Sequence, residues 1–584
     1  MTAATDTERP RAGRPLRVRA TMVVTALLFV FALLVARLAQ LQIADADFYR
    51  RYADRQQILT QELSARRGHI FDRKGRLLAT SVQRYSVYAD PKAVTDPDAT
   101  AAILSELLDV SRRRLREDLR KDRYFVWVKR QIPDRLAERV RSLGLRGVHM
   151  RRESKRLYPQ GRLAAHVIGF TDIDGRGLAG VERTMDALLR GRPGLETVLC
   201  DGGRRIFRSE LDKLDRKPFA GLDVRLSLDA YVQEIAEQEL AKACEKHAPE
   251  CGAAVVLDAR DGGVLAMASQ PSFDPQAPAA TPVAHQRNIA ISDAYEFGSV
   301  MKPFPIAAAL DGGIVTPETE FDCHNGLWQL GARTLHDAHE YGVLDVSSIL
   351  CHSSNIGAAQ IAMELGKEGL YAGIRNFGFG RPTGIALPGE TGGIVRPLRT
   401  WNRYSVVSVS FGQELAVTPL AVARAFTAFA NQGVLVQPRI IESVTAGDGE
   451  VVYAADEPMV GNRAVGPTVA AQVLRMLRRV VTEGTGRNVK MEEYPVAGKT
   501  GTAQLLREDG RGYSEDRYLS NFAGLAPYPD CRIVVLVCLK NPTKNGYYGG
   551  TAAAPAVREI IRRTLRYMQV PAARRGGTPD GESV

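Results

Sequence analysis

The sequence predicts an α+β protein that one N-terminal transmembrane helix holds in a membrane. One observation is the uncharged apolar run ATMVVTALLFVFALLVA over residues 20–36, with no second run of comparable length downstream. Another is that strand-like segments lie around residues 251–269 and 496–540, with long apolar helical segments between them. Strands at both ends with helices between them indicate an antiparallel sheet packed against helices. A length of 584 residues suits two or three domains better than one.

The apolar run predicts an anchor and its orientation. It is a little short for the roughly 20 residues of a bilayer span. Because Arg37 can extend its side chain to the headgroups and LAQLQI can complete the span, we place the transmembrane helix at residues 20–42. A cleaved signal peptide is the alternative, but Arg37 disfavours a cleavage site in LLVARLAQ.

Charges on either side of this helix predict the side of the membrane. Asp45 and Asp47 follow the helix, and five arginines precede it: Arg9, Arg11, Arg14, Arg17 and Arg19. The positive-inside rule then makes residues 1–19 a cytoplasmic tail. The predicted location is the cytoplasmic (inner) membrane, with a single pass and an extracytoplasmic, periplasmic body.

An elongated N-terminal module is predicted over residues 43–220. The polar segment DADFYRRYADRQQILTQEL carries scattered apolar residues and predicts a helix leading away from the membrane. In RRGHIFDRKGRLLAT, Lys74-Gly75 predicts a turn between the short strands HIF and RLLA. Helices are predicted at ILSELLDV near Ile103 and at DRLAERVRSLG near Asp134.

The character of the sequence changes near Gly221, and a second domain is predicted over residues 221–570. It begins with a strand at LDVRLSLD, a helix at YVQEIAEQELAKACEKH, and two strands in CGAAVVLDARDGGVLAMAS. Late strands are predicted at VAGKTGTAQ, NFAGLAP and RIVVLVCLK, and the helix AVREIIRRTLRYM closes the domain. Residues 571–584 predict a flexible tail.

Net charge excludes few classes of binding partner. A net charge of +12 suits nucleic acid, an anionic membrane surface or an anionic polymer. No zinc-finger or RNP-like pattern accompanies the arginines, so nucleic-acid binding is not predicted.

The cysteine pattern disfavours both a zinc site and a dense disulfide framework, because CxxC spacing is absent. The seven cysteines are Cys200, Cys244, Cys251, Cys323, Cys351, Cys531 and Cys538. The last two lie in the apolar run CRIVVLVC, which predicts a buried strand. Their odd offset places them on opposite faces of that strand, so we expect free thiols there.

The first chemical signal is Ser299-Val300-Met301-Lys302, which opens the apolar helix VMKPFPIAAALDGG. Positions i and i+3 share a helix face, so the Ser299 hydroxyl and the Lys302 amine can meet. A serine nucleophile needs a base, and a lysine serves when burial and nearby cations lower its pKa. Pro303 fits only near a helix start, where free N–H groups and the helix dipole favour an oxyanion. Alone, SxxK is a weak pattern that a surface serine and lysine also explain.

The second signal is Ser353-Ser354-Asn355, immediately before the helix IGAAQIAMELG. Serine and asparagine are preferred helix N-caps, and capping explains this segment without any function. The functional alternative gives Ser353 a role in proton relay and Asn355 a hydrogen bond to a bound substrate.

The third signal is Lys499-Thr500-Gly501-Thr502 in the predicted strand PVAGKTGTAQ. Strand alternation places Lys499 and Gly501 on one face, where the missing side chain of Gly501 lets a ligand approach the backbone. A turn is the alternative, since glycine is disfavoured in strands. The segment lacks the GxxxxGK[ST] pattern, so we exclude a phosphate-binding loop.

Taken together, SxxK, SxN and KTG in this order resemble the active-site motifs of penicillin-binding proteins and serine β-lactamases. The flanking segments YEFGSVMKPF, SSNIGAAQIA and VAGKTGTAQ look like class B penicillin-binding proteins, and RGHIFDRKGRLLA and HVIGFTDIDGRGLAGVE look like their N-terminal module. The resemblance runs from about Leu41 to about Met568. At Phe297 the class commonly has proline, and we expect this departure to loosen the turn before Ser299 without removing a reacting group.

The resemblance implies a penicillin-binding, serine β-lactamase-like transpeptidase domain and a mechanism. Ser299 would attack the carbonyl between the two terminal D-Ala residues of a peptidoglycan stem peptide, and Lys302 would take its proton. Ser353 and Lys499 would help return a proton to the departing D-Ala, while Asn355 would hydrogen-bond the substrate backbone.

The resemblance also implies the substrate contacts. Backbone N–H groups of Ser299 and Thr502 would form the oxyanion hole. Lys499, Thr500 and Thr502 would hold the terminal carboxylate, although alternation turns the Thr502 side chain away from Lys499. No metal or cofactor is implied, and the histidines lack metal-ligand spacing. β-Lactams should acylate Ser299 because they resemble the D-Ala-D-Ala terminus.

Within the class, YEFGSVMKPF and GLAGVE look most like the septal, cell-division type, with the elongation type as the alternative. The implied partners are stem peptides, β-lactams, the cytoplasmic membrane, a SEDS-family glycosyltransferase and other division-complex membrane proteins. A non-catalytic β-lactam sensor or wall-binding scaffold is a rival, but residues 1–19 leave no room for a signalling domain. A β-lactamase is a second rival, and it would leave the N-terminal module without a purpose.

Overall fold

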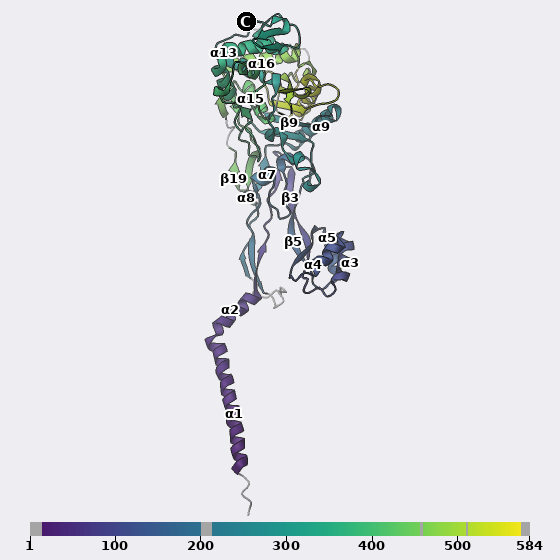
Figure 1. The fold of residues 1–584 in the computed structure, drawn as a ribbon, viewed down its shortest axis with the longest axis vertical. Coiled ribbons are helices and arrows are strands. Elements are labelled where there is room, and N and C mark those ends of the chain that lie inside the picture. Colours follow the sequence, from purple (N-terminus) through teal and green to yellow (C-terminus); the bar gives the residue numbers. More distant parts are fainter. Residues whose placement is uncertain (1–13, 200–212, 456–459, 508, 510–511, 574–584) are drawn as a thin grey trace, which may run out of the picture. The chain divides into compact units, whose positions relative to one another are not determined.

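The computed structural model describes residues 14–199, 213–455, 460–507, 509 and 512–573 (Figure 1). Its internal contacts divide the chain into two compact units. Unit 1 combines Met1–Ala65 with Arg192–Phe219, and unit 2 combines Arg66–Gly191 with Ala220–Val584. Most of the two predicted tails, as well as Cys200, lies outside the described residues.

Unit 1 contains the predicted anchor. Helix α1 (Arg14–Ala39) continues through a π-helical turn, Gln40–Ala44, so that 28 residues from Arg17 form one helix long and apolar enough to cross a membrane. No residue of its apolar window is buried within the protein. The predicted span over residues 20–42 lies within this helix, and its exact bounds stay a prediction.

The helix predicted after the span is only partly correct. Helix α2 (Ala46–Gln57) ends at Gln57, and the next residues form strand β1 (Ile58–Leu63). β1 pairs antiparallel with β6 (Gly194–Leu199), which in turn pairs with β7 (Lys213–Arg216). The strand depends on a partner more than 130 residues away in the chain, and this tertiary context overrides the local helical pattern.

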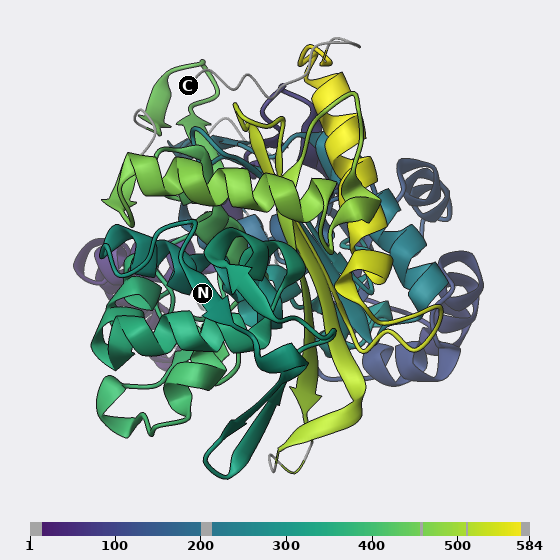
Figure 2. The ribbon, with the colours of Figure 1, turned by 90° about the horizontal axis from the view of Figure 1, so that it is seen from above.

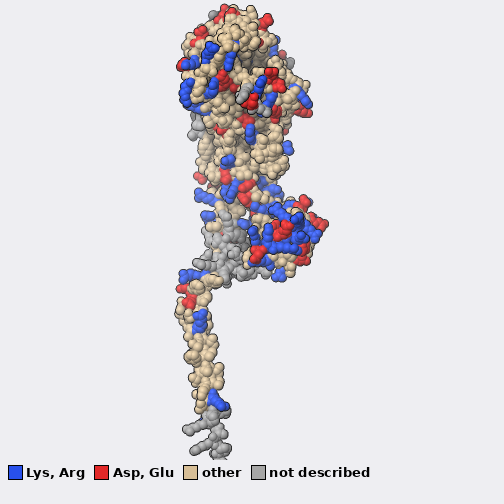
Figure 3. All heavy atoms as spheres, in the orientation of Figure 1, with Lys and Arg blue, Asp and Glu red and all other residues tan. Residues whose placement is uncertain are grey.

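In unit 2, a lobe of sheet and helices follows the predicted turn at Lys74-Gly75. Strand β3 (Leu77–Ala89) pairs with β2 (Ile70–Phe71), β4 (Val126–Ile132) and β5 (Val148–Leu157). Helices α3 (Pro97–Leu108), α4 (Arg112–Leu119) and α5 (Asp134–Ser142) share a buried core with these strands. Lys and Arg side chains gather on the surface of this lobe (Figure 3).

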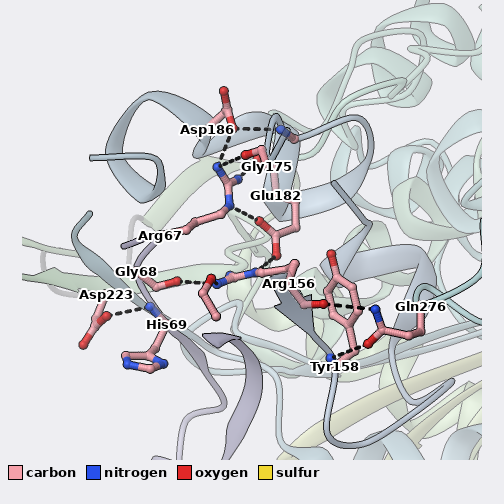
Figure 4. A network of polar contacts seen from close by, with 12 residues as sticks. Arg67, Gly68, His69, Arg156, Tyr158, Gly175, Glu182, Asp186, Asp223 and Gln276 are labelled. Carbon is pink, nitrogen blue, oxygen red and sulfur yellow. Dashed lines mark hydrogen bonds and ion pairs between the residues drawn. The ribbon is translucent and has the colours of Figure 1, made fainter. Parts of the chain in front are cut away.

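A buried ionic network ties the segment before β2 to α7 (Gly180–Thr184) and α8 (Asp186–Leu189) (Figure 4). The Glu182 carboxylate is fully buried and pairs with Arg67 at 2.7 Å and with Arg156 at 2.6 Å. Arg67 also pairs with Asp186 at 2.6 Å. Glu182 thus contacts both buried guanidinium groups, and Asp186 supplies the second negative charge of the network.

One sheet joins segments from before and after Gly221. Strand β8 (Asp223–Leu226) pairs parallel with β2 and antiparallel with β18 (Ile441–Thr445), which pairs with β19 (Val451–Ala454). The segment Arg66–Gly191 therefore packs in the same unit as the C-terminal residues. The domain boundaries at 43–220 and 221–570 stay a prediction.

A second sheet forms the centre of the C-terminal part (Figure 2). Its strand order is β10-β9-β23-β22-β21, with every pair antiparallel. The strands are β9 (Cys251–Asp258), β10 (Val264–Gln270), β21 (Ala497–Leu506), β22 (Tyr513–Ala526) and β23 (Ile533–Lys540). Helices α9 (Ala230–His247) and α18 (Ala554–Tyr567) cover one face, while α15 (Pro419–Ala430) and α16 (Pro467–Thr482) contact the sheet from another cluster of the core. This confirms the predicted antiparallel sheet packed with helices.

Shorter elements complete this part. The helices that carry motifs are η4 (Gly298–Met301), α11 (Pro303–Asp311), α12 (Val346–His352) and α13 (Asn355–Asn376). Other helices are α6 (Ala165–Ile168), η2 (Pro278–Ala280), η3 (Val283–Gln286), α10 (Ile289–Ser292), η5 (His324–Gly326), η6 (Leu398–Thr400), α14 (Ser405–Ser410), η7 (Arg487–Val489) and α17 (Gly549–Ala552). Small antiparallel pairs are β11 (Glu320–Asp322) with β14 (Val343–Asp345), β12 (Leu327–Leu330) with β13 (Arg333–His336), β15 (Ile394–Val395) with β16 (Leu415–Ala416), and β17 (Val434–Val436) with β20 (Val460–Arg463).

The described cysteines are all free thiols, so the prediction that Cys531 and Cys538 do not bridge is confirmed. The reason given for this prediction, that the two cysteines lie on opposite faces of one strand, was wrong for Cys531. Strand β23 begins only at Ile533, so strand alternation does not reach Cys531. Both thiols are buried, and burial raises the pKa of Cys531 to about 12.

Candidate active site

Ser299 lies in a 3₁₀ turn, η4, immediately before helix α11. Pro303 is the first residue of α11, as predicted. The helix argument for SxxK needs one correction, since Ser299 and Lys302 are related across a 3₁₀ turn and not within an α-helix. With three residues per turn, positions i and i+3 still lie on the same side.

The turn before Ser299 packs directly on strand β21. Gly298 has a left-handed φ of +62°, and a Cβ there would lie 2.8 Å from Thr502 O. The Gly298 N–H donates to Gly412 O at 3.4 Å, which ties the turn to the segment before β16. Ser299 and Thr502 are thus brought to adjoining backbone segments.

Lys302 connects the first and second motifs. Its side chain is fully buried, and its Nζ donates to Asn355 Oδ1 at 2.8 Å, to Ser353 O at 2.5 Å and to Ser353 Oγ at 3.2 Å. No hydrogen bond joins it to the half-buried Ser299 hydroxyl in the part of the chain that the structure describes. Catalytic hydrogen bonds often tighten only when substrate binds.

Lys499 connects the third motif to the same serine. It is fully buried on β21, and its Nζ donates to Ser353 Oγ at 2.9 Å. The Ser353 hydroxyl therefore lies within hydrogen-bond distance of both lysines. The structure thus brings Ser353 of the second motif together with a lysine from each of the other two.

The segment Ser353–Asn355 combines both predicted explanations. Ser353 ends α12 with a left-handed φ of +64°, a conformation that non-glycine residues seldom adopt. Ser354 caps α13 by accepting from Gly357 N at 2.9 Å. Asn355 contacts Lys302 through Oδ1 and donates from Nδ2 to His336 O at 3.0 Å. Capping by Ser354 holds its two neighbours beside the lysines.

Burial lowers the pKa values of both lysines. Burial, followed by the charge of Lys499, lowers the pKa of Lys302 well below its ordinary value. Burial lowers the pKa of Lys499 to about 7. Two close ammonium groups titrate as a coupled pair. A neutral amine for proton abstraction and a retained positive charge are therefore compatible near neutral pH.

The remaining residues of the third motif already contact the protein. The Thr500 hydroxyl lies 2.7 Å from the Thr485 hydroxyl, and Thr502 Oγ1 accepts from Gly549 N at 3.0 Å. A Cβ on Gly501 would lie 2.2 Å from Asn521 Oδ1. The absent side chain of Gly501 thus makes room for the protein's own atoms, which corrects the expectation that it admits a ligand.

Two family models match the chain. The penicillin binding protein transpeptidase domain matches residues 252–562, and the penicillin-binding protein dimerisation domain matches residues 62–226. The chain is 36% identical to the probable peptidoglycan D,D-transpeptidase PenA of Neisseria meningitidis, over 94% of this chain and 93% of that protein. The corresponding identity with peptidoglycan D,D-transpeptidase FtsI of Escherichia coli is 31%, over 98% and 96%.

This chain belongs to the class B penicillin-binding proteins. A solved structure of penicillin-binding protein 3 from Mycobacterium tuberculosis with aztreonam is 30% identical, with a TM-score of 0.68, and the match covers 88% of this chain and 98% of that one. Membership of this FtsI-like family makes the protein a transpeptidase that interacts with peptidoglycan and β-lactams. Its apolar N-terminal helix makes it a membrane-anchored member.

In this class B penicillin-binding protein, Asp337 supports the second motif and was missed by the sequence analysis. Its carboxylate accepts from the Ser354 hydroxyl at 2.5 Å and from the backbone N–H groups of Asn355 and Ile356 at the start of α13. Negative charge is favourable at a helix N-terminus. Asp337 follows β13, so only a folded chain shows that it reaches α13.

Replacing Asp337 with alanine should loosen the Ser353–Asn355 segment. We expect a loss of about 1–2 kcal/mol of stability from the missing cap contacts, and about tenfold slower acylation by fluorescent penicillin because Ser353 and Asn355 contact Lys302. Thermal unfolding and labelling kinetics measure the two effects. Asp322→Ala is the matched control, since this exposed carboxylate contacts His324 and not α13. Unchanged labelling in Asp337→Ala would contradict the expectation.

Proposed function

We propose that this class B penicillin-binding protein cross-links peptidoglycan stem peptides in the septal wall through an acyl-enzyme on Ser299. The observation that carries the proposal is the Ser353 hydroxyl between the buried amines of Lys302 and Lys499. This arrangement supports a neutral base three residues after the proposed nucleophile and a route for a proton toward a leaving group.

In the proposed acylation, Ser299 Oγ forms a bond to the penultimate D-Ala carbonyl carbon while Lys302 takes the hydroxyl proton. The carbonyl oxygen becomes an oxyanion that accepts hydrogen bonds from the Ser299 and Thr502 backbone N–H groups. The C–N bond then breaks, and a proton passes through Ser353 to the amine of the departing D-Ala. An acceptor amine next attacks the ester, loses a proton to the base and releases Ser299.

The other residues of the motifs are proposed to bind the substrate. Lys499 would pair with the terminal carboxylate, with Thr500 and Thr502 beside it on β21. The Gly501 backbone forms the strand edge along which the stem peptide would lie. Asn355 Nδ2 carries a second hydrogen besides the one given to His336 O, and this hydrogen would bond the substrate backbone.

The proposed location follows from the helix over residues 17–44. Arg17 and Arg19 on its N-terminal side favour a cytoplasmic N-terminus and an extracytoplasmic, periplasmic body. The anchor and the N-terminal module, proposed as residues 43–220, would contact a SEDS-family glycosyltransferase and other division-complex membrane proteins. The Lys- and Arg-rich surface over α3, α4 and α5 is a candidate contact surface (Figure 3). Residues 221–570 are the proposed transpeptidase domain.

The function is tested with uncross-linked glycan strands that carry pentapeptide stems ending in D-Ala-D-Ala. The full-length protein in detergent should release D-Ala and form peptide cross-links in about equal amounts, and penicillin treatment should stop both. Release of D-Ala without cross-links would indicate a hydrolase instead. Absence of both products, with a SEDS-family glycosyltransferase added, would favour the scaffold alternative.

Acylation should depend on pH in opposite ways through the two lysines. As pH falls, Lys302 gains a proton and can no longer accept one from Ser299, so the acylation rate at saturation should fall. As pH rises above about 7, Lys499 loses its charge, so the affinity for the β-lactam carboxylate should fall. Saturation kinetics with fluorescent penicillin between pH 5 and 9 separate the two effects. A rate and an affinity that are both flat over this range would contradict these assignments.

A further inference from the structure

Asn521 is a fully buried polar residue on β22, one strand away from the third motif. It lies directly opposite Gly501 in the register of β21 and β22. Its Nδ2 donates to Phe297 O at 3.1 Å. Its Oδ1 is buried and has no hydrogen-bond partner among the described residues. The amide thus crosses from the sheet to the residue two positions before Ser299.

An unpaired buried oxygen is unfavourable, and departures of this kind concentrate at functional sites. Leucine has the same branched shape, is somewhat larger, and would occupy this position without leaving an oxygen unpaired. The property that asparagine adds is the N–H group that bonds Phe297 O. The Phe297 side chain is also fully buried, and an aromatic ring has no N–H or O–H group that could replace the Asn521 donor.

The three backbone segments meet closely at this point. A Cβ on Gly501 would lie 2.2 Å from Asn521 Oδ1 and 2.7 Å from Phe297 O. A Cβ on Gly298 would lie 2.8 Å from Thr502 O. The turn that carries Ser299 therefore rests on β21, and the Asn521 side chain ties that turn to β22.

We infer that Asn521 is a positioning residue that sets the separation between the Ser299 and Thr502 backbone N–H groups in the oxyanion hole. This inference rests on the proposed function. An oxyanion hole acts on the charge that develops in the transition state, so its geometry affects the acylation step more than the binding of the ligand. The restraint also holds the turn that Phe297, in place of the proline common in the class, was expected to loosen.

Two substitutions with opposite changes in volume test this role. Asn521→Leu and Asn521→Ser share the loss of the donor to Phe297 O. In the full-length protein, acylation by fluorescent penicillin is followed over a range of concentrations, and rates are normalised to the protein that finally becomes labelled. We expect the saturating acylation rate constant to fall about tenfold to hundredfold in both variants. The half-saturating concentration should stay within about twofold of the wild-type value.

Asn431→Leu is the matched control, because this amide also donates to a backbone carbonyl, Ala259 O, but from the end of α15. It should leave the acylation rate constant unchanged. Saturating rate constants of both Asn521 variants within about twofold of wild type would overturn the inference. Variants that fail to fold but acylate normally once folded would also overturn it. A rise in the half-saturating concentration as large as the fall in the rate constant would do the same. A wild-type protein that forms no adduct would instead overturn the proposed function, which separates the two failures.

Discussion

Replacing Ser299 with alanine should abolish the covalent adduct with fluorescent penicillin. The substitution removes the one oxygen that the proposed mechanism uses as nucleophile, and Ser299 Oγ makes no hydrogen bond that would hold the described structure together. Loss of a catalytic serine lowers rates by on the order of 10³–10⁶-fold, which places labelling below detection. Gel fluorescence of the detergent-solubilised full-length protein after prolonged incubation measures the adduct.

The matched control for this variant is Ser443→Ala, a half-buried serine on β18. It should label like the wild type. An adduct that persists in Ser299→Ala would assign the nucleophile to another residue. No adduct on folded wild-type protein would overturn the active-enzyme proposal and favour a scaffold, or an enzyme that depends on a partner.

Replacing Glu182 with alanine should produce the largest loss of stability. Its carboxylate is fully buried and pairs with Arg67 and Arg156 (Figure 4). Arg67 keeps its pair with Asp186, but Arg156 would keep only the neutral partners Gly68 O and Ser81. Removing one partner of a buried ion pair costs about 3–5 kcal/mol, because a desolvated charge is left without a counter-charge. A lower thermal unfolding midpoint of the full-length protein measures this loss.

Glu117→Ala is the matched control, since the Arg113–Glu117 ion pair on α4 is exposed and spaced i to i+4. Exposed pairs of this kind contribute at most about 0.5 kcal/mol. Glu182→Gln keeps the shape and one acceptor oxygen and should fall between the two. Equal unfolding midpoints for Glu182→Ala and Glu117→Ala would contradict the role assigned to the buried network.

Local patterns predicted most of the elements and the three motifs. The spacing of Ser299 and Lys302 is set within one turn, and Pro303 marks the following helix start on stereochemical grounds alone. The antiparallel sheet was predicted from short strand-like segments at both ends of the domain, with long apolar helical segments between them. Strand β1 was missed because its pairing partner, Gly194–Leu199, is remote in the chain.

The supporting residues of the site could not be found in this way. Asp337 and Asn521 belong to no motif, and each acts through a backbone group far away in the sequence. The reason given for Gly501 was wrong for the same cause, since the atoms that exclude a Cβ come from Phe297 and Asn521. The roles of these residues depend on tertiary contacts between segments that are separate in the chain. A single sequence does not show which segments make those contacts.

The sheet shared across Gly221 has a practical consequence for protein engineering. A truncation that begins at Gly221 would remove β2 from β8 and uncover an unpaired strand edge, which promotes aggregation. The chain leaves unit 2 at Gly191 and returns at Ala220, and within that unit Leu222 N donates to Leu188 O at 2.9 Å. A water-soluble version for crystallisation or inhibitor screening is therefore better built as Arg66–Gly191 joined by a short linker to residues 220–573. It would omit the anchor with strands β1, β6 and β7, and keep the sheet of β2 and β8 and the sheet of β9 and β21 whole.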